Sequence, residues 1–173
     1  QKKKKLYAFE VLERQVVDDG YSETFTLLLN SSNKNFQSGD LLGIAPPNDP
    51  VERQYSMARV SKDKILLSIK RHEKGLCSNY LYDLRVGDKL EGTIQINKEF
   101  HLVKGAKNVL LIGNGTGIAP YLGMIEQSPK ANIQLYWGGR TQRSFELYED
   151  RIEKAVQTGT LASYQIAYSR MTG

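Results

Sequence analysis

A glycine-rich turn in the second half of the chain has the composition of a phosphate-binding loop. It reads Gly-Asn-Gly-Thr-Gly over positions 113–117. The apolar run before it, 108–112, is typical of a strand buried on both faces, and the apolar pattern after it, 121–127, suits a helix with one packed side. A strand, a glycine turn and a helix in this order present backbone N–H groups and a positive helix end to an anion. An ordinary tight turn is the alternative, and the turn alone does not decide between them.

Two further predicted strands also end in residues that suit phosphate. The strand expected over 132–137 runs into Gly138-Gly139-Arg140, and the strand expected over 161–169 ends at Ser169 and Arg170. Strands that alternate with helices form a right-handed parallel sheet with helices on its faces. Such sheets bind ligands beyond the carboxyl ends of their strands, so we expect these three strand ends to form one site.

The helices between these strands carry their own start and stop signals. Ser128-Pro129 is a natural stop for the first helix. A second helix is expected from about 145 to 156, with Ser144 as its cap, acidic residues near its positive end, and Gly159 closing it.

The first half of the chain has the pattern of short antiparallel strands with turn signals at close spacing. Strands are expected at 6–17, 23–29, 41–45, 53–60, 64–70 and 89–96, with a short helix at 77–84. This pattern favours a small closed or nearly closed β-barrel. Because strand–helix alternation begins near 104–107, we expect an antiparallel β-barrel domain over 1–104 and a parallel α/β domain over 105–173.

Composition narrows the classes of function. The 173 residues are 40% hydrophobic and 25% charged, as in soluble globular proteins, and no apolar run reaches the length of a membrane span. The net charge is +5, but the four lysines at 2–5 supply +4 of it, so the rest of the chain carries +1. The chain therefore has no basic body of the kind that binds nucleic acid. The lysine run is interpreted as a solvated linker end, with contact to a membrane surface or an acidic partner as the alternative.

Cysteine and histidine usage argues against a metal site. Cys77 is the one cysteine, which excludes an internal disulfide and a multi-cysteine metal site, and His72 and His101 form no ligand spacing. A reducing compartment is compatible with this usage, so we expect a cytoplasmic location or the cytoplasm-facing part of a larger protein. Because the chain begins with Gln1 instead of Met, we hypothesise that it was cut from a longer polypeptide.

Five short motifs resemble those of the ferredoxin–NADP reductase superfamily and occur in the family's order. Arg53-Gln54-Tyr55-Ser56 resembles its Arg-x-Tyr-Ser flavin motif, and 74–81 resembles its flavin-pyrophosphate segment. The turn at 113–120 resembles its nicotinamide-nucleotide loop, and 136–140 the segment after its second strand. Ser169-Arg170 resembles the pair that NADP-using members place on the 2′-phosphate. Within the superfamily, the motifs resemble those of plant-type ferredoxin reductases and of the reductase parts of cytochrome P450 reductase and sulfite reductase flavoprotein.

The resemblance places a flavin on the barrel. It implies that Arg53 forks onto a flavin phosphate, with a surface ion pair to Glu52 or Asp49 as the alternative role. Tyr55 would stack on the isoalloxazine ring, or else pack within the barrel. Ser56 would hydrogen-bond near the flavin N5, where hydride is exchanged, and it is the one catalytic residue that we expect.

Two further segments of the barrel are implied to contact the flavin. The first is a strand that runs under the flavin and comprises Ser68, Ile69 and Lys70, although core packing explains Ile69 equally well. The second is a helix start whose backbone N–H groups, with the Ser78 hydroxyl, would hold the pyrophosphate; it comprises Gly75, Leu76, Cys77 and Ser78. Cys77 is expected to contribute its backbone and not a nucleophile, because no histidine partner is evident.

The nucleotide side of the resemblance lies in the second half of the chain. The phosphates of NADPH would lie against Gly115, Thr116 and Gly117, with Arg140 near them or in a surface salt bridge. Ser169 and Arg170 would bind the 2′-phosphate and so select NADPH over NADH.

The function that the resemblance implies is hydride transfer from NADPH to a flavin, followed by electron transfer to a one-electron acceptor. FAD is expected over FMN on family prevalence, and the acceptor would be a flavodoxin-like, ferredoxin-like or haem protein or domain. Two alternatives stay open: a flavin reductase of the same fold that releases reduced flavin, and a non-catalytic flavin- or nucleotide-binding regulatory module. Nucleic acid, a metal and a membrane segment within this chain are not expected.

The chain also departs from the family pattern. The family has two more strands after the Ser-Arg pair, which bring a lysine-and-tyrosine NADP segment, a Cys-Gly motif and an aromatic C-terminus over the flavin. Here the sequence stops at Met171-Thr172-Gly173. We therefore expect a C-terminally truncated reductase module with weakened NADPH affinity and doubtful catalysis. The run from Pro46 to Arg53 is too short for the helical insertion of the diflavin relatives.

Overall fold

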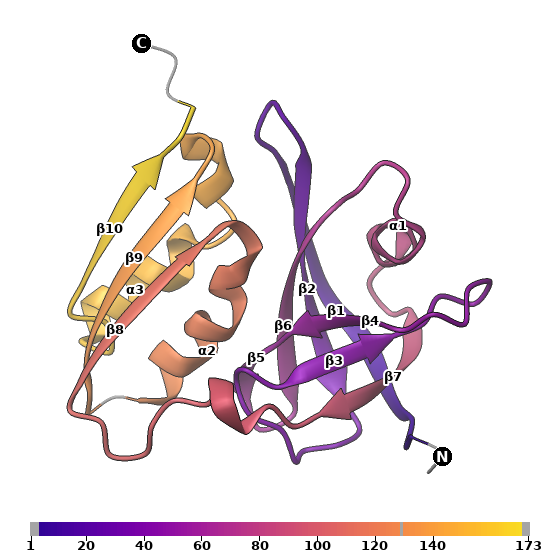
Figure 1. Cartoon of the computed structure of the whole chain (residues 1–173), viewed down its shortest axis with the longest axis horizontal. Coiled ribbons are helices and arrows are strands. Elements are labelled where there is room, and N and C mark those ends of the chain that lie inside the picture. Colours follow the sequence, from indigo (N-terminus) through magenta and orange to yellow (C-terminus); the bar gives the residue numbers. More distant parts are fainter. Residues whose placement is uncertain (1–3, 129, 171–173) are drawn as a thin grey trace.

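The computed structural model describes residues 4–128 and 130–170. Lys2, Lys3, Pro129 and the last three residues lie outside the described residues, as do the parts of the predictions above that concern them. Figure 1 shows a strongly curled antiparallel sheet beside a smaller parallel sheet, with a helix of the second unit between them. The fold class expected from the sequence, a β-barrel followed by parallel α/β structure, is confirmed.

The antiparallel sheet has seven strands in the order β4-β3-β7-β1-β2-β6-β5. Their bounds are β1 Tyr7–Asp18, β2 Glu23–Ser31, β3 Leu41–Ile44, β4 Arg53–Ser56, β5 Ala58–Ser61, β6 Lys64–Lys70 and β7 Lys89–Gln95. The single strand expected over 53–60 is wrong, because the chain breaks at Met57 into two strands. Met57 bonds through its backbone to Gly39 and Asp40, and its buried side chain joins the barrel core. The break places β4 and β5 at opposite edges of the sheet and so nearly closes the barrel.

Alternation along the strands divides the barrel side chains between two cores. Leu27 and Leu67 point inward and are fully buried, as the period-two pattern predicts. Leu28 and Leu66, one residue further along, are also buried, but they belong to the core of the parallel sheet. The outer face of β2 and β6 is thus covered by the second half of the chain. Helix α1, Leu76–Asp83, packs Leu81 into the barrel core.

The parallel sheet has the order β10-β9-β8, with β8 Asn108–Asn114, β9 Asn132–Gly139 and β10 Ser163–Tyr168. A short 3₁₀ turn η1, Lys98–Phe100, lies in the connection from the barrel. The first crossover contains a 3₁₀ turn, η2 Gly115–Ile118, and helix α2 Ala119–Gln127. The second contains the 3₁₀ turn η3 Gln142–Phe145 and helix α3 Glu149–Thr158.

Strand β8 corrects one prediction about this sheet. The run 108–112 was expected to be buried on both faces, but Leu110 and Ile112 are 57% and 66% exposed. Leu111 is buried and shares a core with residues from both α2 and α3. The expectation of helices on both faces is therefore wrong, because both helices cover one face of the sheet and β8 is an edge strand.

The start of α3 corrects a second prediction. Ser144 does not cap a helix beginning at 145; together with Thr141 it forms the capping box of η3, and α3 begins at Glu149. The Ser144 hydroxyl also donates to Asp19 Oδ2 over 2.9 Å, so a tertiary contact with the barrel holds this turn in place. Gly159 closes α3 with a left-handed φ of +78°, as predicted.

A buried hydrogen bond joins strand β6 of the barrel to the start of helix α3 and yields a first testable prediction. The Ser68 and Tyr148 hydroxyls lie 2.6 Å apart, and Tyr148 is 1% exposed. Burial raises the pKa of Tyr148 to about 12, against the ordinary value of 10.0. The neutral phenol is therefore favoured in the folded state. Its contribution to stability is complete below pH 10 and is lost as the pH rises towards 12.

We expect Tyr148→Phe to lower the free energy of unfolding by about 1 kcal/mol at pH 7, because one buried hydrogen bond is lost. At pH 11 the difference from the unaltered chain should vanish, because only the unaltered chain loses stability through this phenol. Denaturant unfolding at both pH values checks this prediction. An equal difference at both pH values would contradict it.

Two absences hold for the residues described here. No helix among residues 4–128 and 130–170 is long and apolar enough to cross a membrane. Within the same described ranges, no three His, Cys, Asp or Glu side chains gather as they would around a metal ion.

Candidate functional site

The carboxyl ends of the three parallel strands open into a cleft of about 610 Å³ that faces the barrel. The parallel sheet and its crossovers contribute Asn114, Gly115, Thr116, Trp137, Gly138, Gly139, Arg140, Ser144, Tyr148, Ala167, Tyr168 and Ser169. The barrel contributes Asp19, Ser22, Thr24 and Lys70. The three strand ends line this one cleft, as expected, and the ligand that binds there stays a prediction. The contribution of the barrel was not predicted from the sequence, Lys70 apart.

The glycine turn at the end of β8 lies on the cleft wall. Gly115 has a left-handed φ of +51°, and its carbonyl accepts a hydrogen bond from Trp137 Nε1 over 3.0 Å. A Cβ at Gly113 would lie 2.8 Å from the Tyr121 ring, whereas a Cβ at Gly117 would meet no atom within 4 Å. Gly113 is therefore required for packing, and Gly117 leaves the backbone open to close approach by a ligand.

Two arginines converge at the far edge of this cleft. The N–H of Ser169 donates to Gly139 O, and the N–H of Arg170 donates to Arg140 O, so pairing continues past β10 and aligns Arg170 with Arg140. Both guanidinium groups lie near the ring of Tyr21, at 4.7 Å for Arg170 and 5.9 Å for Arg140. This convergence makes the edge attractive to an anion.

The barrel turn that carries Tyr21 is tied to this edge by hydrogen bonds. Arg140 Nη1 donates to Ser22 Oγ over 3.0 Å. Burial works to raise the pKa of the Asp19 carboxyl, but the N–H groups of Ser22 and Tyr21 and the Ser144 hydroxyl outweigh burial and hold that pKa below its usual value. The ionised Asp19 carboxylate therefore holds the barrel turn against η3 through Ser144. Tyr21, Ser22 and Asp19 were missed from the sequence, because a turn residue gives no signal of a distant partner.

Strand β4 carries the predicted flavin motif at an edge of the barrel. Arg53 and Tyr55 are half-buried while Gln54 and Ser56 are exposed, as strand alternation predicts. Arg53 Nη2 lies 3.2 Å from Asp49 Oδ2, with 42% of its side chain exposed. The alternative ion pair to Asp49 is thus present in the structure, and the guanidinium still reaches the surface.

The residues predicted to contact the flavin from 68–70 and from the start of α1 do not all reach the surface. Lys70 lines the cleft, but Ile69 is buried in the barrel core and the Ser68 hydroxyl is bonded to Tyr148. Cys77 is buried, its thiol donates to Ile44 O over 3.6 Å, and burial raises its pKa. A thiol in this state is a poor nucleophile, which agrees with the expected backbone role.

The start of α1 requires a glycine. A Cβ at Gly75 would lie 2.6 Å from Ser78 Oγ and 2.9 Å from His72 Cβ. The buried Ser78 hydroxyl donates to Gly75 O over 3.2 Å and accepts from the N–H of His72 over 3.1 Å. The Ser78 hydroxyl therefore bonds to the loop before the helix, whereas the sequence predicted that it would bond to a flavin phosphate. Leu76, beside it, is 63% exposed.

Known proteins resemble the chain in sequence and in structure, although no protein-family model matches it. It is 30% identical over 127 residues to NADPH-dependent diflavin oxidoreductase 1 of Saccharomyces cerevisiae, covering 72% of this chain and 19% of that protein. It is 30% identical over 112 residues to NADPH–cytochrome P450 reductase of Dictyostelium discoideum, covering 60% of this chain and 17% of that protein. Ferredoxin-NADP⁺ reductase from Plasmodium falciparum, solved with 2′P-AMP, superposes with a TM-score of 0.80 at 21% identity, covering 96% of this chain and 73% of that one.

The chain belongs to the ferredoxin–NADP reductase superfamily. It spans about a fifth of the length of the two curated relatives named above. The motifs that resemble those of the superfamily lie on the expected elements. Arg53 to Ser56 form β4, Gly75 precedes α1, and Gly115 to Gly117 fall within η2. That these residues bind a flavin and a nicotinamide nucleotide stays a prediction.

Proposed function

We propose that this chain is the flavin- and nucleotide-binding part of an NADPH-dependent reductase. In this proposal 1–104 binds FAD and 105–173 binds NADPH. With both cofactors bound, hydride would be transferred from NADPH to FAD, and electrons would then pass to a one-electron acceptor. The observation that carries the proposal is the cleft in which the glycine turn, Arg140 and Ser169 face Lys70 of the barrel. Membership in a superfamily whose named relatives use NADPH supports it.

The residues present fit the phosphate groups of both cofactors. Glycine is required at Gly75 and Gly113, and the backbone is open at Gly117. Lys70 and Arg140 line the cleft with the glycine turn, and the partly exposed Arg53 guanidinium lies on β4. All three supply positive charge that would offset phosphate charge. The flavin, once bound, supplies the chemistry of hydride acceptance.

The protein's part in the reaction is to orient and shield. Arg53 would hold a flavin phosphate, the Tyr55 ring would lie against the isoalloxazine, and the exposed Ser56 hydroxyl would donate a hydrogen bond near N5. Thr116, which lines the cleft, would orient the nucleotide. The proposed acceptor is a flavodoxin-like, ferredoxin-like or haem protein or domain, and the proposed location is cytoplasmic.

Flavin loading and acceptor turnover test this proposal together. The purified chain is titrated with FAD and with FMN, and the loaded protein is then mixed with NADPH and ferricyanide. We expect FAD to bind more tightly than FMN, and NADPH to reduce the bound FAD more slowly than an ordinary enzymatic rate, in keeping with the weakened NADPH affinity expected from the sequence. Flavin binding without turnover would favour a regulatory module, release of reduced flavin would favour a flavin reductase, and absence of flavin binding would overturn the proposal.

The proposed contact between Arg170 and the 2′-phosphate of NADPH gives a testable prediction. Arg170→Ala should weaken binding of 2′-phospho-AMP by about 10- to 100-fold, because a charge-assisted hydrogen bond contributes about 1.5–3 kcal/mol. Binding of AMP should change less than about twofold. Calorimetric titration of both nucleotides checks this.

Arg151→Ala is the matched control, because it removes a positive charge that pairs with Glu126 on the surface of α3 and α2. It should leave both affinities unchanged. Equal weakening of AMP and 2′-phospho-AMP in Arg170→Ala would contradict a role in reading the 2′-phosphate.

A further inference from the structure

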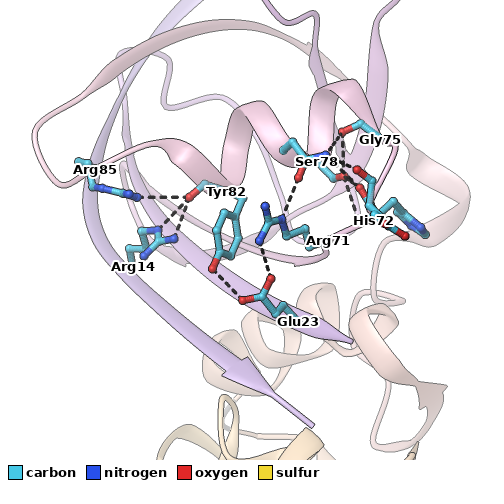
Figure 2. Close-up of polar contacts among 10 residues, drawn as sticks. Arg14, Glu23, Arg71, His72, Gly75, Ser78, Tyr82 and Arg85 are labelled. Atoms are coloured by element: carbon cyan, nitrogen blue, oxygen red, sulfur yellow. Dashed lines mark hydrogen bonds and ion pairs between the residues drawn. The ribbon is translucent and has the colours of Figure 1, made fainter. Parts of the chain in front are cut away.

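A polar network joins strand β2 to the helix start at Gly75, and Figure 2 shows it beneath α1. The Glu23 carboxylate accepts one hydrogen bond from Arg71 Nη1 over 2.6 Å and another from the Tyr82 hydroxyl over 2.9 Å. The guanidinium of Arg71 lies over the Tyr82 ring, 4.0 Å from its centroid. Arg71 Nε donates to Asn79 Oδ1 over 2.8 Å. One arginine is thus held by a carboxylate, a ring and an amide.

Arg71 decides which way the Asn79 amide faces. A side-chain amide has an acceptor oxygen and a donor nitrogen, and it can turn to present either. Because Arg71 is a donor only, the Asn79 oxygen must face it, and the nitrogen must face the loop before α1. That nitrogen donates to His72 O over 3.0 Å, Glu73 O over 3.1 Å and Gly75 O over 2.9 Å.

The orientation of these carbonyls determines where the N–H groups of the loop point. In a trans peptide the C=O and the following N–H point in opposite directions, and the described residues contain no cis peptide. With the His72, Glu73 and Gly75 carbonyls turned towards Asn79, the N–H groups of Glu73, Lys74 and Leu76 point away from it. Successive outward N–H groups at a helix start form a concave binding surface for anions.

The other contacts of Arg71 argue against its being a phosphate ligand itself. Its Nη1 and Nε are bonded to Glu23 and Asn79, and one of its faces is stacked on Tyr82. On the opposite side of this tyrosine, Arg14 lies 4.9 Å from the ring centroid and donates to Tyr82 O over 2.8 Å. Arg14 therefore supports the same helix without any contact to the loop at 72–75.

We propose that Arg71 and Asn79 are positioning residues that set the backbone N–H groups of Glu73, Lys74 and Leu76 for the flavin pyrophosphate. This inference rests on the proposed function, because it takes the start of α1 as the pyrophosphate site. Glu23 is the anchor of the pair: it orients Arg71, which orients Asn79, which orients the loop.

Comparison of FAD with riboflavin, which lacks phosphate, tests the inference. We expect Arg71→Lys and Asn79→Ala each to weaken FAD binding by about tenfold or more and riboflavin binding by less than about twofold. Lysine keeps the charge but cannot bond Glu23 and Asn79 through one planar fork. Arg14→Lys is the control and should leave both affinities within about twofold. Fluorescence titration gives the affinities, and thermal unfolding establishes that each variant is folded.

The outcomes separate this inference from the proposed function. Equal weakening of FAD and riboflavin overturns the inference, because it would mean that the network only maintains the fold. Selective loss in Arg71→Lys without loss in Asn79→Ala also overturns it, since Arg71 would then be a direct ligand. If the unaltered chain binds FAD more tightly than riboflavin and the variants do so to the same extent, the inference is overturned and the proposed function stands. An unaltered chain that binds no FAD overturns the proposed function together with it.

Discussion

Gly123→Val is expected to lower the free energy of unfolding by about 3 kcal/mol, the upper range for forcing atoms into a packed interface. Gly123 lies in α2, where the helix packs directly on β5 of the barrel. A Cβ there would lie 2.1 Å from Ser38 Oγ and 2.8 Å from both the backbone N and O of Arg59. The Arg59 backbone cannot move aside easily, because β5 pairs with β6 at Arg59 and Ile65. The added atoms would also displace Ser38 Oγ, which accepts a hydrogen bond from the Arg59 N–H over 2.8 Å.

The clash should outweigh the usual benefit of replacing a helical glycine, which is at most about 1 kcal/mol. Denaturant unfolding measures the effect. Gln127→Val, at an exposed position in the same helix, is the matched control and should cost less than about 1 kcal/mol. Because α2 follows the glycine turn, separating it from the barrel should also weaken nucleotide binding in the cleft. A Gly123→Val chain as stable as the control would show that α2 and β5 do not pack this closely.

Arg53→Ala is expected to weaken FAD binding by about 100-fold. A guanidinium that forks onto a phosphate makes charge-assisted hydrogen bonds worth about 1.5–3 kcal/mol, and alanine removes all of them. In the structure Arg53 pairs with Asp49, which would compete with the phosphate for the same donors. Asp49→Asn should therefore leave FAD affinity unchanged or raise it, because it frees the guanidinium.

A second arginine distinguishes this site effect from a loss of stability. Arg59 lies on β5, the next strand along the chain, with its guanidinium over the Phe36 ring, and it donates to Phe36 O over 2.9 Å. Arg59→Ala should lower stability without changing FAD affinity. Fluorescence titration of the three variants gives the comparison. If Arg53→Ala and Arg59→Ala affect FAD binding alike, Arg53 has only a structural role.

Local patterns were enough to predict most of the elements. Alternation over 23–29 and 64–70 depends only on which face of a strand meets a core, so the inward Leu27 and Leu67 could be predicted without knowledge of their partners. The positive φ that ends α3 is a local demand, and Gly159 met it. The sequence was misleading where an apolar residue had two possible settings. Leu110 and Ile112 look like core residues in any local pattern, yet they lie on the open face of an edge strand.

The candidate site divides in the same way. Its glycine turns and its Arg-x-Tyr-Ser motif are contiguous in the sequence, so residue types and spacing by themselves determined the superfamily and the positions of the strand ends. Contacts between distant segments were decided only by tertiary structure. Tyr21 reaches two arginines from a barrel turn, Ser68 bonds to Tyr148, and Glu23 orients the start of α1 through Arg71 and Asn79. A hydrogen bond depends on positions in space, and a chain read in order carries no record of which distant residue will complete it.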